Sequence, residues 1–293
     1  MQLSFATAHM RGEFGICSGQ DDETPFERIP VTDFATLLTD NPGLAVALIV
    51  AAGFAGWIDA VVGGGGLVLI PVLLIAFPNA VPATALGTNK AVAVWGTLSA
   101  SITYLRRTRV PLKFLAAAVP IALVFSGLGA AAAAAISTDW MRPMVLVLLL
   151  AVGLWVALRP GFGSGDATPL RRAGVAGGLC AAGAISFYDG IFGPGTGTFL
   201  IMAFTALVTG DFLRSAAMSK VVNLATNIGA LLVFGAGGHI VWLLALVLAI
   251  ANVIGAQVGA RMAINRGSGF VRIVLLVVVV AMVGKLAYDM IAA

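Results

Sequence analysis

The chain has 293 residues, of which 60% are hydrophobic and 10% are charged, with a mean hydropathy of +1.02. Soluble domains carry about 25% charged residues, so this composition excludes an ordinary soluble enzyme and indicates a membrane protein. The net charge of +4 lies mainly in short loops between apolar segments, which is typical of membrane topology and not of nucleic-acid binding. Cys17 and Cys180 predict neither a disulfide framework nor a metal site.

Residues 1–42 form a polar segment that contains seven of the thirteen acidic residues. A secretory signal peptide has a basic start followed by an apolar stretch, and this segment has neither. We expect a polar N-terminal tail or surface segment outside the membrane.

Ten apolar segments follow the tail. Most reach the roughly 20 residues that a membrane-spanning helix needs. The segments 64–78 and 193–208 are shorter, and each either crosses the membrane or forms a hairpin that returns to the same side. The expected segments are 43–62, 64–78, 84–104, 112–136, 141–158, 171–190, 193–208, 214–235, 240–261 and 270–290.

A repeat of 130 residues organises these segments. Asp59 and Asp189 are separated by this offset, and so are Lys90 and Lys220. We therefore predict an all-α polytopic membrane protein built from two repeats of about five apolar segments each, a common architecture in secondary transporters. The first repeat covers 43–158 and the second covers 171–293, with a cytoplasmic linker at 159–170.

Arginine and lysine residues predict the orientation. The loop 105–113 contains Arg106, Arg107, Arg109 and Lys113, whereas its equivalent, 235–243, has no arginine or lysine. Equivalent loops of opposite charge character predict that the two repeats are inverted relative to each other. Both termini are then expected on the periplasmic or extracellular side of the membrane.

Glycine clusters interrupt the apolar pattern at matching places in both halves. One cluster is Gly63, Gly64, Gly65 and Gly66; the other spans 193–198 and contains Gly193, Gly195 and Gly197 with Thr196 and Thr198. Glycine disfavours a continuous helix, and a break at membrane depth exposes N–H groups that favour an anion. Close helix packing through small residues is the alternative interpretation. Pro194 and the threonines make the second break different, so the two need not contribute equally.

The lysines within apolar segments have three interpretations, and the aspartates have two. Lys90 and Lys220 either neutralise Asp59 or Asp189, extend to the membrane interface, or attract an anionic substrate. Asp59 and Asp189 either form fixed ion pairs or couple protons to transport. Asn89, Ser219 and Asn223 join the glycine clusters and the lysines in the predicted substrate-binding set, and Thr226 and Asn227 add further polar groups on the same helix. No cofactor or metal is expected.

The motifs resemble those of the sulfite exporter TauE/SafE family. The segments 59–66 (DAVVGGGG) with Pro71 and 85–90 (ALGTNK) are similar to the signature of its first repeat. The segments 187–190 (FYDG) and 193–197 (GPGTG), with Ser219, Lys220 and Asn223, are similar to the YfcA-like branch. The resemblance covers about 43–290 and implies a bacterial inner-membrane transporter of small sulfur-containing anions.

The sequence therefore predicts a secondary transporter of a small anion, most simply sulfite or an organosulfonate, that works by alternating access between the repeats. A transporter of another small anion or solute and a passive anion channel remain alternatives. An intramembrane aspartyl protease fits poorly, because the residues before Asp59 are Gly56, Trp57 and Ile58 and do not form the Gly-x-Gly-Asp signature. The lysines have no place in that chemistry either. The oligomeric state, the direction of transport and the coupling ion are left open.

Overall fold

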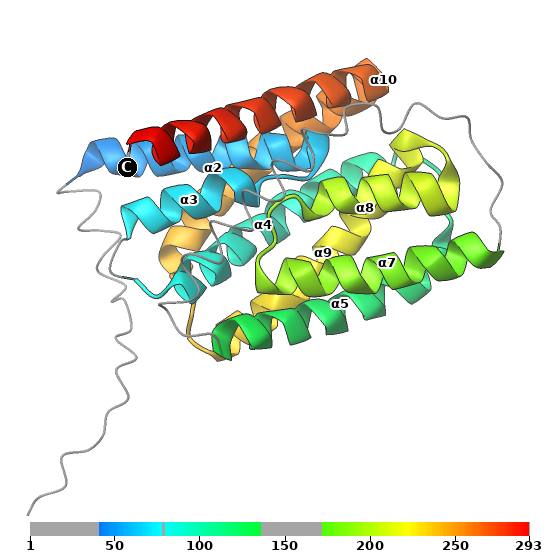
Figure 1. Cartoon of the computed structure of the whole chain (residues 1–293), viewed down its shortest axis with the longest axis horizontal. Coiled ribbons are helices and arrows are strands. Elements are labelled where there is room, and N and C mark those ends of the chain that lie inside the picture. Colours follow the sequence, from blue (N-terminus) through cyan, green and yellow to red (C-terminus); the bar gives the residue numbers. More distant parts are fainter. Residues whose placement is uncertain (1–40, 78–79, 136–171, 293) are drawn as a thin grey trace, which may run out of the picture.

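The computed structural model describes residues 41–77, 80–135 and 172–292. Within these ranges the chain is helical, as expected (Figure 1). Most of the predicted tail, the segment 141–158 and the linker 159–170 lie outside the described residues. The helices are α2 (Pro42–Val62), α3 (Gly66–Ala76), α4 (Pro82–Leu105), α5 (Leu112–Ala135), α7 (Arg172–Ile191), α8 (Thr196–Phe204), a π-helical turn η1 (Thr205–Thr209), α9 (Phe212–Ala236) and α10 (Trp242–Ala292).

Five stretches of these helices are long and apolar enough to cross a membrane, which confirms a multi-pass membrane protein. They are Pro42–Val62, Leu112–Ala135, Gly174–Ile191, Leu213–Ala236 and Trp242–Gly267. The expected segments 240–261 and 270–290 correspond to two helices within α10, which are divided by a non-helical backbone conformation at Gly267 (φ = 71°, ψ = −168°). A helix rises about 1.5 Å per residue, so α3 is too short to cross a hydrocarbon core of about 30 Å.

The helix boundaries recur with the 130-residue offset. Adding it to the limits of α2, α3 and α4 reproduces those of α7, α8 and α9 to within two residues. Equivalent contacts also recur, with the first and second halves interchanged. A Cβ on Gly129 would meet Phe187 and Gly190, and a Cβ on Gly259 would meet Trp57 and Ala60, which are the equivalent pairs.

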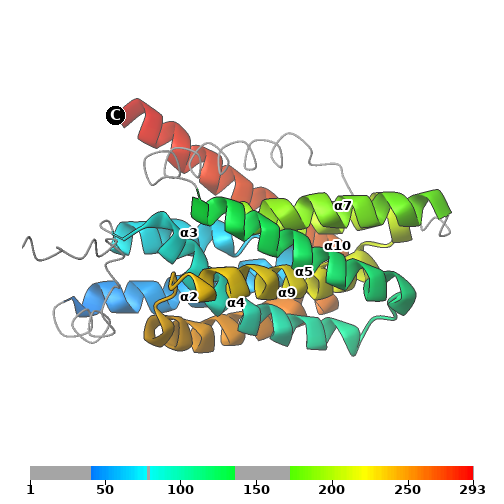
Figure 2. The ribbon, with the colours of Figure 1, turned by 90° about the horizontal axis from the view of Figure 1, so that it is seen from below.

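Two helical hairpins enter the bundle from opposite ends. α2 with α3 comes from one end and α7 with α8 from the other, and their tips meet inside the molecule (Figure 1). The long helices run roughly along the same axis when the molecule is turned by 90° (Figure 2). α4 and α9 pack against each other in the middle of the bundle and bring their polar residues to these tips.

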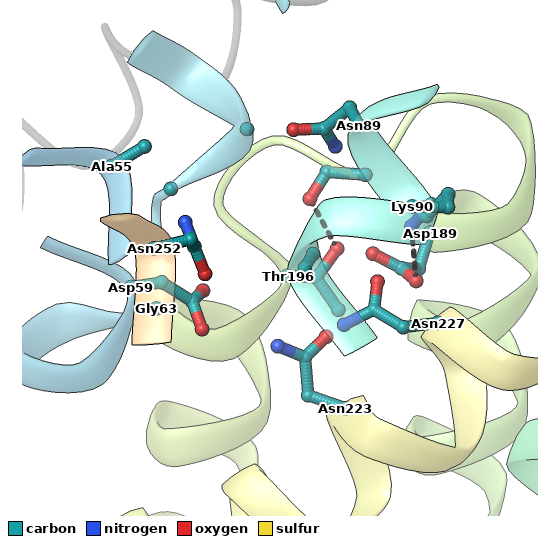
Figure 3. A pocket seen from close by; sticks show the side chains of 14 residues that line it. Ala55, Asp59, Gly63, Asn89, Lys90, Asp189, Thr196, Asn223, Asn227 and Asn252 are labelled. Carbon is teal, nitrogen blue, oxygen red and sulfur yellow. Dashed lines mark hydrogen bonds and ion pairs between the residues drawn. The ribbon is translucent and has the colours of Figure 1, made fainter. Parts of the chain in front are cut away.

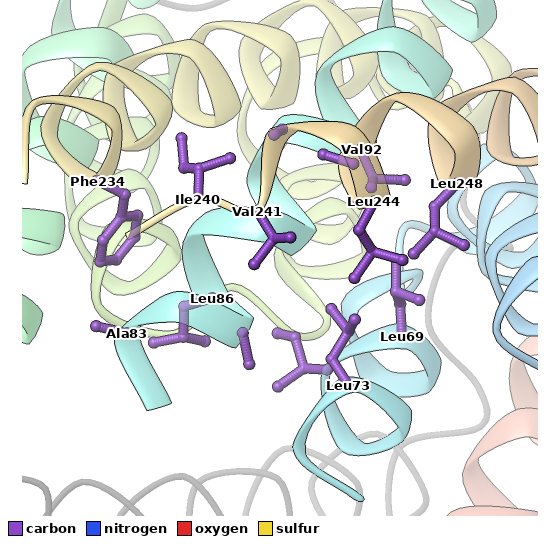
Figure 4. Packing of buried hydrophobic residues seen from close by; sticks show 14 of the residues in the cluster. Leu69, Leu73, Ala83, Leu86, Val92, Phe234, Ile240, Val241, Leu244 and Leu248 are labelled. Atoms are coloured by element: carbon purple, nitrogen blue, oxygen red, sulfur yellow. The ribbon is translucent and has the colours of Figure 1, made fainter. Parts of the chain in front are cut away.

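The largest apolar cluster anchors the first hairpin. Leu69 and Leu73 of α3 pack near Leu86 of α4 and Leu244 and Leu248 of α10 (Figure 4). Each of these side chains is at most 2% exposed. Burial of a leucine contributes about 1.5–3 kcal/mol where the alternative is water, whereas inside a bilayer the gain is close packing between helices. This cluster therefore holds α3 against the bundle although α3 does not span the membrane.

Basic residues gather at one end of the bundle. The α4–α5 loop, the start of α9 and the α10 break share one apolar cluster through Val110, Leu213 and Phe270. The exposed basic residues around that end are Arg106, Arg107, Arg109, Lys113, Arg214, Arg261 and Arg266. At the opposite end, the described residues of the α3–α4 and α9–α10 connections contain no lysine or arginine.

Candidate functional site

The two hairpin tips touch through backbone. Gly63 follows α2 with φ = 83°, a left-handed conformation that favours glycine. The Gly197 N–H donates to the Gly63 carbonyl at 3.1 Å, and Thr198 Oγ1 donates to the Val62 carbonyl at 2.5 Å. A Cβ on either Gly63 or Gly197 would collide with the backbone of the other. Glycine at both positions therefore allows the tips to meet.

The two lysine–aspartate pairs form between the halves. Lys90 Nζ of α4 donates to Asp189 Oδ2 of α7 at 2.6 Å. Lys220 Nζ of α9 lies 3.4 Å from Asp59 Oδ2 of α2. The sequence left open which acid each lysine meets. Each pair links one half to the other, so the packing of the halves depends on both.

Lys220 has a second function at the end of α2. Its Nζ also donates to the backbone carbonyl of Asp59, and the Tyr104 hydroxyl donates to the carbonyl of Ala60 at 3.0 Å. Carbonyls in the last turn of a helix lack intrahelical partners and carry partial negative charge. Together with Thr198, these side chains provide donors for the end of α2 within a largely apolar bundle.

A small polar cavity lies where the tips, α4, α7, α9 and α10 come together (Figure 3). Its volume is about 30 Å³, room for roughly two water molecules, so only a small solute fits without movement of the helices. The residues that line it are Ala55, Asp59, Gly63, Gly65, Gly66, Asn89, Lys90, Ala93, Asp189, Gly193, Thr196, Asn223, Asn227 and Asn252.

Ten of the sixteen predicted site residues line this cavity. They are Asp59, Gly63, Gly65, Gly66, Asn89, Lys90, Asp189, Gly193, Thr196 and Asn223. Six others lie behind the lining: Gly64, Gly195, Gly197, Thr198, Ser219 and Lys220. Gly197, Thr198 and Lys220 hold the tip of α2, and Ser219 Oγ donates to the Gly197 carbonyl at 3.0 Å. They support the cavity without forming its surface.

Four lining residues were outside the predicted site set: Ala55, Ala93, Asn227 and Asn252. Asn252 donates to the Ala52 carbonyl at 2.9 Å and so joins α10 to α2. Its signal in the sequence was an amide side chain within an apolar span. Ala93 is 130 residues before Asn223, so the offset from a recognised residue pointed to it. Ala55 carried no chemical signal.

The donors in the cavity suit an anion. The N–H groups of Gly65 and Gly66, at the start of α3, have no acceptor within the structurally described part of the chain. The Asn89 side chain, 5% exposed, likewise has no hydrogen-bond partner there. A helix N-terminus, a lysine and amide N–H groups are the donors that oxyanions prefer. Among the described residues, no group of three histidine, cysteine or acidic side chains could hold a metal ion.

His239 lies in the turn between α9 and α10, away from the lining residues, with its ring 6.4 Å from that of Phe234. It is 7% exposed, and this burial lowers the pKa of its imidazole below the ordinary 6.5. His239 is not among the residues that line the cavity.

The sequence of the chain is similar to one family model and to several relatives. The family model described as sulfite exporter TauE/SafE matches residues 48–286. The probable membrane transporter protein YfcA of Escherichia coli (strain K12) is 35% identical over 256 residues, covering 87% of this chain and 94% of the relative. The probable membrane transporter protein ORF9 of Sinorhizobium sp is 36% identical over 253 residues, covering 84% and 93%. A probable membrane transporter protein of Haemophilus influenzae is 35% identical over 245 residues, covering 83% and 95%. No solved structure matches the chain significantly.

Proposed function

Because this chain belongs to the sulfite exporter TauE/SafE family of membrane transporters, we propose that it is a secondary transporter of a small anion. The observation that carries the proposal is the polar cavity at the hairpin tips, with Lys90 and the free N–H groups of Gly65 and Gly66 in its lining. A charged side chain inside a membrane protein generally faces a cavity or a partner, and Lys90 has both.

Alternating access between two inverted repeats is the mechanism that we propose. Its support is the recurrence of helix boundaries and the entry of the hairpins from opposite ends (Figure 1). The breaks at Gly63–Gly65 and Gly193–Gly195 act as the non-helical elements around the substrate, a common arrangement in transporters. In this mechanism the hairpins move relative to α4 and α9, and the cavity opens first to one side and then to the other.

Sulfite and organosulfonates are the proposed substrates. Three kinds of donor surround the cavity: an ammonium group, backbone N–H groups at the start of α3, and the amides of Asn89, Asn223, Asn227 and Asn252. A sulfur oxyanion presents several acceptor oxygens in a small volume, which fits the size of the cavity. The name of the family adds support for sulfite.

We also propose that the basic end of the bundle faces the cytoplasm of a bacterial inner membrane, with both termini periplasmic. Two single cysteines introduced after replacement of Cys17 and Cys180 test this orientation. Arg107→Cys, in the basic loop, should react with a membrane-impermeant maleimide only after the cells are opened. Trp242→Cys, 61% exposed near the opposite end, should react in intact cells. Reaction of both from one side would contradict the proposed orientation.

A thermal-stability screen of purified protein tests the substrate class. Sulfite, thiosulfate, methanesulfonate and acetate are each added, with dimethyl sulfoxide as a neutral control. A ligand at 100 times its Kd stabilises the folded state by about 2.7 kcal/mol. The sulfur anions should raise the unfolding temperature of the wild type. They should not raise that of Gly66→Leu, whose Cβ would lie 3.6 Å from the Asn89 Nδ2 in the cavity wall. Gly43→Leu, at a position with open space around it, should respond as the wild type does. Stabilisation by acetate alone would overturn the proposed substrate class.

A further inference from the structure

The formal charges around the cavity cancel. Asp59, Asp189 and Lys90 line it, and Lys220 lies directly behind Asp59. An anion that entered this neutral site alone would bring an uncompensated charge into the interior of a membrane protein, at a cost of several kcal/mol. A positive charge must therefore enter with the anion, and a proton on one of the carboxylates is the smallest one that these residues can accept.

Protonation of Asp59 and protonation of Asp189 would leave their lysine partners in different surroundings. Asp189 is the one hydrogen-bond partner of Lys90 among the described residues, and both side chains are at most 3% exposed. A proton on Asp189 would leave the Lys90 ammonium buried without a negatively charged partner. Lys220, in contrast, also donates to the backbone carbonyl of Asp59. A proton on Asp59 leaves that hydrogen bond in place, at the negative end of the α2 dipole.

Asp59 is also the more accessible of the two. Its side chain is 17% exposed, against 2% for that of Asp189, and its ion-pair distance is 3.4 Å, against 2.6 Å. The groups that face it are Lys220 of α9, the Tyr104 hydroxyl and Thr97 of α4, and, across the cavity, Lys90 and Asp189. The cavity-lining residues of α3, α8 and α10 are Gly65, Gly66, Thr196 and Asn252, none of which titrates.

We infer that Asp59 is the residue that takes up a proton when the anion enters, whereas Asp189 stays ionised and holds Lys90 in the cavity wall. This inference rests on the proposed function as a small-anion transporter. The proton binds a carboxylate oxygen of Asp59, and Lys220 keeps its three protons and its hydrogen bond to the backbone. The site then carries one net positive charge, which a monoanion neutralises. The anion and the proton therefore occupy the cavity together.

Infrared difference spectroscopy of the full-length protein in lipid vesicles tests the assignment without a substrate. Spectra at neutral and acidic pH reveal the C=O stretch of carboxyl groups that become protonated, and subtraction of a variant's spectrum isolates one residue. Asp59→Asn should remove a band that Asp189→Asn retains. Asp59→Glu, which keeps a carboxyl group, should shift the same band and serves if Asp59→Asn does not fold. A band lost only in Asp189→Asn, or no difference between the wild type and either aspartate variant, overturns the inference.

A second measurement uses methanesulfonate, which does not itself titrate near neutral pH. When methanesulfonate is added in a weak buffer, the wild-type protein should take up a single proton per bound anion. A pH-indicator dye reports this uptake. Gly43→Leu, at a position outside the cavity with open space around it, should retain this uptake, and Asp59→Asn should lose it. Binding without proton uptake in the wild type overturns the inference. Absence of binding in the wild type counts against the proposed substrate class, and the infrared titration then decides the role of Asp59 by itself.

Discussion

The two lysine–aspartate pairs occupy equivalent positions in the two halves, yet their surroundings differ. Lys90 lines the cavity and bonds to Asp189 at 2.6 Å, whereas Lys220 lies outside the lining and divides its donors between the side chain and the backbone of Asp59. The N-terminal ends of α3 and α8 differ as well. The Gly66 N–H is free toward the cavity, whereas that of its equivalent, Thr196, donates to the Gly193 carbonyl at 3.3 Å. A duplicated framework therefore surrounds an asymmetric cavity: Lys90 and Asp189 both line it, whereas of the second pair only Asp59 does and Lys220 binds the tip of the first hairpin.

The largest effect is expected for Lys90→Met. It leaves the Asp189 carboxylate buried without its partner, a change that typically costs about 3–5 kcal/mol. Adding Asp189→Asn should restore most of that stability, because no buried charge remains unpaired. The measurement is the unfolding transition of purified protein in mixed detergent. A single variant as stable as the wild type would show that the pair contributes nothing to the fold.

Gly63→Ala should have the next largest effect, a decrease of at least about 2 kcal/mol in the free energy of unfolding. The substitution combines a left-handed backbone with overpacking against Gly197. Gly64→Ala is the matched control, because its Cβ would meet the flexible end of Leu67 and its φ is not positive. The same unfolding assay applies. Equal stability of the two variants would contradict the close approach of the hairpin tips.

A smaller effect separates the two pairs directly. Lys220→Met combined with Asp59→Asn should remain less stable than the wild type by about 1 kcal/mol, because the Asp59 carbonyl loses a donor from the side chain of Lys220. The Lys90→Met and Asp189→Asn double variant has no such residual loss, since Lys90 donates to the carboxylate alone. Full recovery in both double variants would mean that the pairs are energetically equivalent.

The smallest effect concerns pH. Burial lowers the pKa of His239 below 6.5, so the folded protein binds this proton less readily than the unfolded chain does. The contribution of His239 to stability is therefore full above pH 6.5 and decreases as the pH falls below that value. His239→Gln should flatten this part of the curve of unfolding temperature against pH. An unchanged slope would assign the acid sensitivity to other groups.

Much of this arrangement could be predicted from the sequence. The apolar segments located the helices to within a few residues, and the 130-residue offset related α2, α3 and α4 to α7, α8 and α9. The glycine clusters and the four charged residues identified most of the cavity lining, because such groups are costly inside a membrane unless they serve a site. These signals are local, so a single sequence carries them.

The sequence could not predict which residues pair between helices that are far apart in the chain. The pairing of Lys90 with Asp189 and of Lys220 with Asp59 depends on how helices far apart in the sequence cross. Asn252 was missed for the same reason, since an isolated amide in a span usually bonds between helices, and only the packing places it at the cavity. The repeat does not imply the backbone contact between Gly63 and Gly197, because the residue equivalent to Gly197 in the first half is Leu67.

The central claim, that Lys90 and its cavity bind a small anion, is tested most directly by sulfite binding to the Lys90→Met and Asp189→Asn double variant. Its unfolding transition establishes first that the protein is folded, and isothermal titration then measures the affinity for sulfite beside that of the wild type. We predict a folded double variant whose affinity falls by at least about tenfold, the equivalent of about 1.4 kcal/mol. Sulfite binding with wild-type affinity in this variant would contradict the claim and reduce Lys90 to a structural partner of Asp189.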